Sequence, residues 1–341
     1  TGTKQFFDSQ TFEVMPHSYL KDKNGVYKTG EWITEIEGAN PKTIKVLSDF
    51  YLKDDKNIFN GYGQKIDKAD LNSFEVLGQK GYYAKDKNSV YYSGEKVEGA
   101  NAKTFKIISD DFYSKDDKNV HVSRSKYKRL KVIENADRDT FEVMKKDIRY
   151  SKDKNNIYFV SKSLYDEYDT YFEQGGIIKM KGADKNSFVI EKNDFSYDKN
   201  SVYFMGKKIN GINSAGFKII SNLNSDFSFF LIDNKNLYKF ITIFSEDTDE
   251  IVETKLVPVK NPKVDITSFE SVKKFFTNYY RDKSNVYYYD ADYKELKRLE
   301  GADRNSFISL EGNFGKDNKN VFYNGNKLEG VNSDGLEILD E

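Results

Sequence analysis

Histidine, carboxylate and hydroxyl side chains are the groups in this sequence that could do chemistry, because it contains no cysteine. The chain has 2 His, which are His17 and His121. His121 stands where related segments of the chain have Tyr, which indicates a strand side chain. His17 lies in a variable stretch before Tyr19, which indicates a surface loop. A His-based catalytic triad or a His-rich metal site needs more partners than these two residues provide.

Carboxylates are plentiful, with 55 Asp and Glu together, and a pair of them is enough for acid–base chemistry on a glycosidic bond. Most Asp residues, however, lie in short polar segments typical of turns. A calcium loop places oxygen ligands at alternate positions and ends in a distal Glu, whereas here Lys follows Asp and a hydrophobic run comes at once. We therefore predict structural turns, with no catalytic residue, no metal site and no cofactor. A hidden glycosidase-like pair stays as the alternative.

The elements that must position these residues are repeats. The tripeptide Asp-Lys-Asn recurs along the chain and is followed each time by a β-branched or aromatic run, such as Val90-Tyr91-Tyr92. Degraded copies occur at 233–236, 282–285 and 317–320. The six full copies begin at Asp22, Asp55, Asp86, Asp117, Asp153 and Asp198.

A second mark alternates with the first one. An Asp or Asn is followed three residues later by Thr or Ser, and then by a large apolar residue. Two marks that recur in alternation identify a repeat protein. The second mark begins at Asp8, Asn40, Asp70, Asn101, Asp137, Asp184, Asp265 and Asp303, with weaker copies at Asn213 and Asn332.

One repeat, from Phe74 to Thr104, indicates which elements to expect. Alternating apolar residues predict strands, and the polar tripeptide at Asp86 predicts the turn between two of them. Ser93-Gly94 predicts a tight hairpin, because Gly supplies a positive φ. Asn101 is expected to cap one helical or 3₁₀ turn. Each repeat is thus a β-meander of three or four strands that must stack on its neighbours to bury its aromatic face.

The whole chain is therefore predicted to be all-β, a single tandem array of about nine short β-meander repeats over residues 1–341. Nine unequal repeats exceed the roughly four to eight blades of a propeller, so we favour an open, solenoid-like stack over a closed ring. The repeats are predicted to start near residues 12, 44, 74, 105, 141, 188, 217, 269 and 307, with insertions at 161–178 and 242–264.

Insertions in repeat arrays often map to the binding face. The first insertion is aromatic and acidic together. Tyr is favoured at interfaces, because it offers a large contact area and a polar tip at a low cost in entropy. We therefore predict Tyr165, Tyr168, Tyr171 and Phe172 as binding residues, with a packed hairpin extension as the alternative. The second insertion predicts a long hairpin, because an acidic tip at 246–250 separates two alternating stretches.

The charges nearly balance, with 54 Lys and Arg against 55 Asp and Glu and a formal net charge of −1. Nucleic acids and anionic membrane surfaces select strongly basic chains, so neither partner is expected. No apolar run approaches the roughly 18 residues that span a bilayer, so no transmembrane segment is expected. The chain begins with Thr1 instead of Met and enters a repeat part-way, which favours a signal or anchor segment ahead of it.

The repeat resembles the bacterial DKNYY family, whose name spells its signature. The best matches are Asp86-Lys87-Asn88-Ser89-Val90-Tyr91-Tyr92 and Asp198-Lys199-Asn200-Ser201-Val202-Tyr203-Phe204, and the resemblance runs from residue 12 to residue 332. It implies a repeat protein without known catalytic residues, and many members look like exported or lipid-anchored envelope proteins. The sequence departs from the pattern at 120–122 and at 233–237, where we expect distorted repeats.

Together these features favour a non-enzymatic repeat protein of the cell envelope or surface that binds a protein or glycan partner through an extended face. The step from fold to function is an analogy. One alternative is a cytoplasmic immunity or inhibitor-type binding protein, which fits the balanced charge and the missing cysteines equally well. Another is a carbohydrate-binding or glycan-hydrolysing protein, which a groove lined by aromatic residues with two convergent carboxylates would support.

Overall fold

The computed structural model describes residues 7–109, 112–124, 129–160, 176–222, 228–244, 251–260, 262–272, 278–290, 295–331 and 333–334. Within these ranges the named elements are all strands, and no helix is long and apolar enough to cross a membrane. The described residues up to Gly182 belong to an N-terminal body, and those from Ala183 belong to a C-terminal body.

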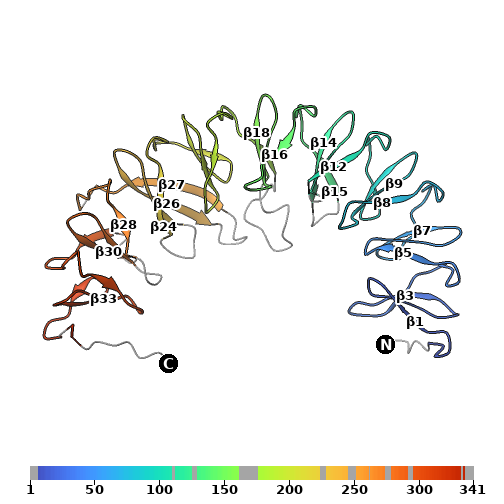
Figure 1. Ribbon diagram of the computed structural model, residues 1–341, viewed down its shortest axis with the longest axis horizontal. Helices are drawn as coiled ribbons and strands as arrows, with labels where there is room; N and C mark the ends of the chain where they lie inside the picture. The colour runs from blue at the N-terminus through green and yellow to red at the C-terminus, as the bar shows by residue number, and fades with distance from the viewer. Residues whose placement is uncertain are drawn as a thin grey trace. The chain divides into compact units, whose positions relative to one another are not determined.

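Each repeat folds into one small antiparallel sheet, in which the strands are neighbours in chain order. We number the nine sheets of the described residues 1 to 9 along the chain. Eight have four strands, and sheet 2 has three strands and a bridge between Phe59 and Lys65. Within each body the sheets follow one another in chain order (Figure 1). The predicted all-β tandem array of open β-meanders is confirmed, and none of these sheets is closed into a barrel.

Five sheets belong to the N-terminal body. Sheet 1 comprises β1 (Glu13–Met15), β2 (Tyr19–Lys21), β3 (Val26–Lys28) and β4 (Thr34–Glu35), and sheet 2 comprises β5 (Lys45–Ser48), β6 (Tyr51–Lys53) and β7 (Ile58–Asn60). Sheet 3 comprises β8 (Glu75–Leu77), β9 (Tyr83–Lys85), β10 (Val90–Tyr92) and β11 (Glu95–Lys96). Sheet 4 comprises β12 (Lys106–Ser109), β13 (Tyr113–Lys115), β14 (Val120–Arg124) and β15 (Arg129–Val132), and sheet 5 comprises β16 (Glu142–Val143), β17 (Tyr150–Lys152), β18 (Ile157–Val160) and β19 (Ile177–Lys179).

Four sheets belong to the C-terminal body. Sheet 6 comprises β20 (Val189–Ile190), β21 (Phe195–Tyr197), β22 (Val202–Phe204) and β23 (Lys207–Ile209), and sheet 7 comprises β24 (Lys218–Asn222), β25 (Phe229–Ile232), β26 (Leu237–Phe244) and β27 (Ile251–Pro258). Sheet 8 comprises β28 (Glu270–Ser271), β29 (Tyr279–Arg281), β30 (Val286–Asp290) and β31 (Glu295–Arg298), and sheet 9 comprises β32 (Ile308–Ser309), β33 (Phe314–Lys316), β34 (Val321–Tyr323) and β35 (Asn326–Lys327).

The hydrophobic core is divided into layers between successive sheets of one body. Tyr51 and Ile58 of sheet 2, for example, are buried against Phe74, Ala84 and Tyr91 of the next repeat. No strand in this layer is longer than four residues, so one repeat cannot enclose its own aromatic side chains. Stability therefore comes from contacts between neighbours, as in other repeat proteins.

An aromatic residue begins the second strand of each described sheet, and in sheets 2 and 8 its hydroxyl group ties the sheet to the next one. Tyr51 is fully buried, and its hydroxyl donates to the carbonyl oxygen of Tyr82 at 2.9 Å and accepts from the N–H of Gly94 at 3.1 Å. The hydroxyl of Tyr279 makes the same kind of contact in the C-terminal body, donating to the carbonyl oxygen of Asn313 at 2.9 Å. These contacts fix sheet 2 against the turns of sheet 3, and sheet 8 against the turns of sheet 9.

The two-residue hairpin predicted at Ser93-Gly94 is confirmed. Both residues have positive φ, 50° for Ser93 and 91° for Gly94, and Tyr92 pairs with Glu95 across the turn. A Cβ on Gly94 would come within 2.2 Å of the Cβ of Asn60, so this tip packs directly on the tip of sheet 2. Gly is therefore required here both for its φ and for its lack of a side chain.

The long hairpin predicted for the second insertion is also confirmed. β26 and β27 pair antiparallel from Tyr238 and Pro258 to Phe244 and Ile251, with one register irregularity near the tip. The acidic tip at 246–250 lies outside the described residues.

Candidate functional site

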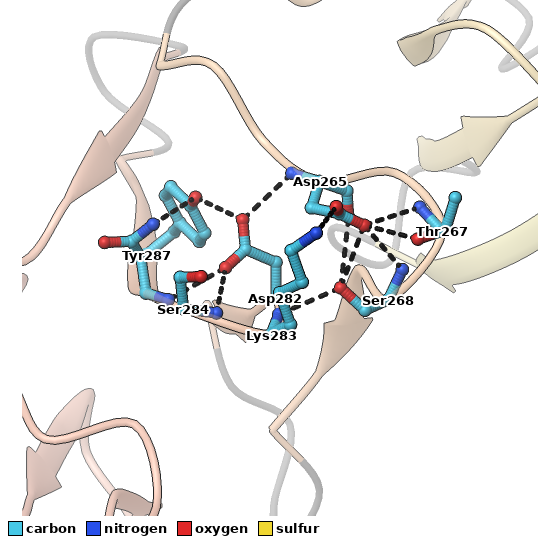
Figure 2. Close-up of polar contacts among 8 residues, drawn as sticks. Asp265, Thr267, Ser268, Asp282, Lys283, Ser284 and Tyr287 are labelled. Atoms are coloured by element: carbon cyan, nitrogen blue, oxygen red, sulfur yellow. Dashed lines mark hydrogen bonds and ion pairs between the residues drawn. The ribbon is translucent and has the colours of Figure 1, made fainter.

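The turn between the second and third strands of each repeat is built around one buried Asp, and Figure 2 shows it in sheet 8. Oδ1 of Asp282 accepts hydrogen bonds from the backbone N–H groups of Ser284 and Asn285, both at 2.8 Å. Oδ2 accepts from the N–H of Asp265 at 2.9 Å and from the hydroxyl of Tyr287 at 2.6 Å. The carboxylate is only 2% exposed, so its charge is satisfied by these four donors.

The second sequence mark forms the other half of the same network. Oδ1 of Asp265 accepts from the N–H and the hydroxyl of Ser268, at 3.2 and 3.1 Å. Oδ1 of Asn101 accepts from the N–H of Lys103 at 3.1 Å, which confirms the cap predicted at Asn101. Oδ2 of Asp265 forms an ion pair with Nζ of Lys283 at 2.7 Å, and the N–H of Lys283 donates to the hydroxyl of Ser268 at 2.9 Å. The two marks that alternate in the sequence therefore meet in space within one repeat (Figure 2).

The buried Asp recurs in all nine described sheets. In every case its Oδ1 accepts from the N–H groups of the residues two and three positions later, at 2.6–3.0 Å. Its Oδ2 accepts from the N–H of the cap residue, at 2.7–3.1 Å. The nine residues, which are 1–5% exposed, are Asp22, Asp54, Asp86, Asp116, Asp153, Asp198, Asp233, Asp282 and Asp317.

Two of these positions correct the predicted register. The sequence mark placed the turn at Asp55 and Asp117, but the buried residues are Asp54 and Asp116, one position earlier. The reason is that the carboxylate must stand four residues before the first buried residue of the next strand, as Asp116 does before Val120. The position of the tripeptide Asp-Lys-Asn relative to the next strand is not fixed in this way.

The expectation that the repeats at 120–122 and 233–237 are distorted was also wrong. Once Asp116 is recognised as the turn residue, no residue is missing before Val120, and β13 and β14 pair in regular register. The turn at Asp233 has the usual pair of N–H contacts, both at 2.8 Å. Side chains of both repeats take part in the core layers of their bodies.

A tyrosine five residues after the buried Asp supplies the fourth hydrogen bond in most repeats. Phe59 and Phe322 occupy this position in sheets 2 and 9, so the ring is tolerated without its hydroxyl. The Tyr hydroxyl to Asp oxygen distances are 2.8 Å for Tyr91, 2.8 Å for Tyr158, 2.9 Å for Tyr203, 3.0 Å for Tyr238, 2.6 Å for Tyr287 and 3.4 Å for Tyr27.

His121 occupies the tyrosine position in sheet 4, so its prediction as a strand side chain is confirmed. It is 2% exposed, and its Nε2 lies 3.5 Å from Oδ2 of Asp116, which is long for a hydrogen bond. Burial lowers the pKa of His121, and the attraction of Asp116 only partly offsets this. The residue therefore replaces a structural tyrosine and has no access to a substrate.

The electrostatics of the turn suit folding better than catalysis. Burial alone would raise the pKa of Asp282, but the N–H of Asp265, the Tyr287 hydroxyl and the turn N–H groups outweigh it and lower that pKa below the usual value. A carboxylate with four donors and a low pKa is a poor general base. Among the described residues no three His, Cys, Asp or Glu side chains are grouped so that they could hold a metal ion.

Replacing Tyr91 by phenylalanine should isolate the value of the hydroxyl contact. The hydroxyl donates to a buried carboxylate at 2.8 Å, so we expect the free energy of unfolding to fall by about 2 kcal/mol. Urea denaturation followed by circular dichroism measures this loss. Tyr323→Phe is the control, because Tyr323 is 42% exposed and this variant should therefore lose far less. Equal losses in the two variants would contradict this account.

The residues predicted to bind a partner, Tyr165, Tyr168, Tyr171 and Phe172, lie outside the described residues. A different group of aromatic side chains is exposed within the N-terminal body, at the hairpin tips of sheets 1 and 2. Trp32 is 76% exposed and Tyr62 is 61% exposed. Both line a hollow of about 390 Å³, together with Lys28, Asp49, Phe50 and Ser93.

The tips of sheets 1 and 2 are longer than that of sheet 3. Lys28 pairs with Thr34 and leaves residues 29–33 between them, and the bridge from Phe59 to Lys65 leaves residues 60–64. In sheet 3 only Ser93 and Gly94 separate the paired residues. The added residues carry Trp32 and Tyr62. Trp32 is the chain's 1 Trp, and its place in a lengthened tip is a signal that could have been found in the sequence.

A second hollow of about 380 Å³ adjoins the first, because Asp49 and Phe50 line both of them. His17 lines it too, and its Nδ1 lies 2.9 Å from Oδ1 of Asp49. His17 is exposed in the loop between β1 and β2, as the sequence predicts. The ring of Tyr82 packs against Phe50, with 4.4 Å between the ring centroids.

Lys28 is the cation of the first hollow. Its Nζ donates to the hydroxyl of Tyr19 at 3.1 Å and to the carbonyl oxygen of Asp49 at 3.4 Å, and it lies 4.5 Å from the centroid of the Tyr19 ring. Burial lowers the pKa of Lys28, while the charge of Asp49 opposes that change. These contacts hold the ammonium group at the wall of the hollow.

The result of a comparison with known protein families agrees with the repeats seen in the structure. The model of the DKNYY family matches residues 5–126, 96–162 and 164–300. A comparison with curated proteins gave no match. Because the family model covers most of the sequence and its signature forms the Asp-centred turns, the chain belongs to the DKNYY family.

Proposed function

We propose that this chain is a non-enzymatic repeat protein of the cell envelope or surface, which binds a protein or glycan partner through the hairpin tips of its sheets. The observation that carries the proposal is the exposure of Trp32 and Tyr62 at two neighbouring tips that line one hollow. Large aromatic side chains that are exposed to solvent beside a hollow are typical of recognition surfaces.

The structural contacts of the Asp and Lys side chains support the proposal that the protein is not an enzyme. The signature Asp side chains are buried in turns and saturated mainly by backbone donors. Five of the six cap Asp side chains are paired with the Lys that follows the turn Asp, as Asp265 is with Lys283. A residue that holds a turn together in this way cannot also move protons for a substrate. The signature that defines the family is thus a folding signature, and recognition falls to residues outside it.

The location outside the cytoplasm follows the expectation from the family. It is tested by treating intact source cells with an external protease and measuring the loss of the protein against a cytoplasmic marker. Loss of the protein, together with a mass increment of lipid size, is the expected result. An unmodified protein that resists the protease and remains with the cytoplasmic marker would replace this proposal by the immunity or inhibitor-type alternative.

The binding role is tested with purified envelope material. We expect the wild-type chain to be retained by it and the double variant Trp32→Ala/Tyr62→Ala to be lost. Tyr323→Ala is the matched control, because Tyr323 is also an exposed aromatic residue, at 42%, and lies at the tip of sheet 9. Equal retention of the wild type and the double variant would exclude the tips as the contact surface.

A further inference from the structure

We propose that the two adjoining hollows of the N-terminal body bind a neutral oligosaccharide, with one sugar ring packed against Trp32 and Tyr62 and the next ring beside Phe50 and Tyr82. This inference rests on the proposed binding function and assigns its ligand class. The first hollow, of about 390 Å³, lies within the size range of small-molecule sites.

The aromatic side chains suit the carbon face of a sugar. A pyranose ring presents C–H groups on its faces and hydroxyl groups around its edge, so it needs a flat apolar platform with polar groups beside it. Trp32 and Tyr62 provide the platform, and their rings pack through dispersion and C–H to π contacts. Thr29, Thr34 and Ser93 line the same hollow and carry hydroxyl groups.

The charges of the hollow favour a neutral ligand. Lys28 and Asp49 both line it, so an anion would meet the carboxylate and a quaternary ammonium ion would meet the lysine. The contacts of Lys28 with Tyr19 and with the carbonyl of Asp49 use two of the three protons of its ammonium group. The third proton can be donated to a ligand hydroxyl.

The adjoining hollow extends the site from one sugar ring to at least two. It shares Asp49 and Phe50 with the first, and its other lining residues include His17, Gln79 and Lys80, which can donate or accept hydrogen bonds at the edge of a ring. A chain of sugar rings that crosses Phe50 therefore contacts the tips of sheets 1 and 2 at one end and the start of sheet 3 at the other.

The same residues argue for binding without cleavage. Glycoside hydrolysis uses two carboxyl groups on either side of the bond that is broken. Among the described residues that line the two hollows, Asp49 is the one carboxylate, and its Oδ1 is held by Nδ1 of His17 at 2.9 Å. One carboxylate can orient a hydroxyl group but cannot supply both the acid and the nucleophile.

The only tryptophan of the chain makes the test direct, because its fluorescence reports on this site. The purified full chain is titrated with chitotetraose, cellotetraose and maltotetraose, each in turn. We expect at least one of them to change the emission of Trp32 in a saturable way, and its monosaccharide to bind more weakly. The variant Tyr62→Ala should weaken binding about tenfold or more, since aromatic anchors dominate such contacts. Tyr323→Ala should bind like the wild type.

Choline chloride and heparin are titrated in parallel as a cationic and an anionic rival. Saturation by either rival in place of every neutral sugar would overturn the inference, and so would the absence of a saturable change with all three sugars. If Tyr62→Ala unfolds at a lower urea concentration than the wild type, Trp32→Ala is measured by equilibrium dialysis instead, with the same expected loss. Failure of the sugar titrations with intact retention by envelope material would remove the ligand class and leave the proposed function.

Discussion

Replacing Asp116 by alanine is expected to lower the free energy of unfolding of the N-terminal body by about 3–5 kcal/mol. The change leaves the backbone N–H groups of Asn101, Lys118 and Asn119 without the carboxylate that now accepts them at 2.9, 2.7 and 2.8 Å. Buried donors that lose a charged acceptor carry the full cost of their desolvation. Urea denaturation followed by circular dichroism measures the loss.

The neighbouring residue provides the matched control. Asp117 is exposed and lies one position later in the sequence, where the tripeptide mark placed the turn. Its side chain contacts those of Asn101 and Thr104, at 3.0 Å each, on the solvent side of the turn, so Asp117→Ala should lose no more than about 1 kcal/mol. Should Asp117→Ala prove the more damaging of the two, the register assigned to the turn would be wrong.

Acid is expected to unfold the chain between about pH 4 and pH 2. Hydrogen bonds and ion pairs with Lys87, Lys154 and Lys199 lower the pKa of Asp70, Asp137 and Asp184, respectively, to about 2, from the usual value of 3.8. A carboxyl whose pKa is lower in the folded than in the unfolded state stabilises the fold above pH 3.8. That stabilisation disappears as the pH falls through the folded value. Urea midpoints measured from pH 7 to pH 2 should be level at first and then fall steeply.

The variants for this experiment come from the protein itself. Asn40 and Asn101 occupy the cap position in sheets 2 and 4, so the fold accepts an amide there. The triple variant Asp70→Asn/Asp137→Asn/Asp184→Asn removes three of the groups with lowered pKa values. Its urea midpoint should depend less on pH between 4 and 2 than that of the wild type. An unchanged pH profile would show that the caps are not the groups that titrate.

The local elements of this fold could be predicted because local chemistry determines them. Ser93-Gly94 forms a hairpin turn since Gly94 adopts a positive φ without a steric cost, and the turn at Asp86 follows from the reach of one carboxylate to N–H groups two and three residues on. Each of these turns depends on contacts between residues within about five positions of one another. The pattern of residue types therefore contains the information in full.

Contacts between distant residues could not be read in the same way. The N–H of Asp70 reaches Oδ2 of Asp86 at 2.8 Å across sixteen residues, and nothing in either mark indicates that they meet. The error in the register of the turns at Asp54 and Asp116 has the same origin. Burial of the carboxylate decides which Asp forms the turn, and the tripeptide does not show which Asp is buried. The clue that was available was the constant distance of four residues to the aliphatic residue that opens the next strand.

The candidate site was harder to predict, because its residues lie where the sequence departs from the repeat. Attention to the long insertions led to Tyr165 and its neighbours, which stay a prediction. The lengthened tips that carry Trp32 and Tyr62 add only a few residues each, and the change is visible only after the strands on both sides are aligned. A short insertion was enough because a hairpin tip has solvent on one side and can extend into it.

The division of the core into layers between successive sheets has a consequence for how such chains evolve. Duplication or deletion of one repeat changes only the layers next to it and leaves the others as they were, and a longer tip leaves the strands that form the layers in place. Residues that fold the chain and residues that recognise a partner are thus inherited separately. Relatives with the same signature can acquire different specificities by exchanging only their tips, at almost no cost in stability.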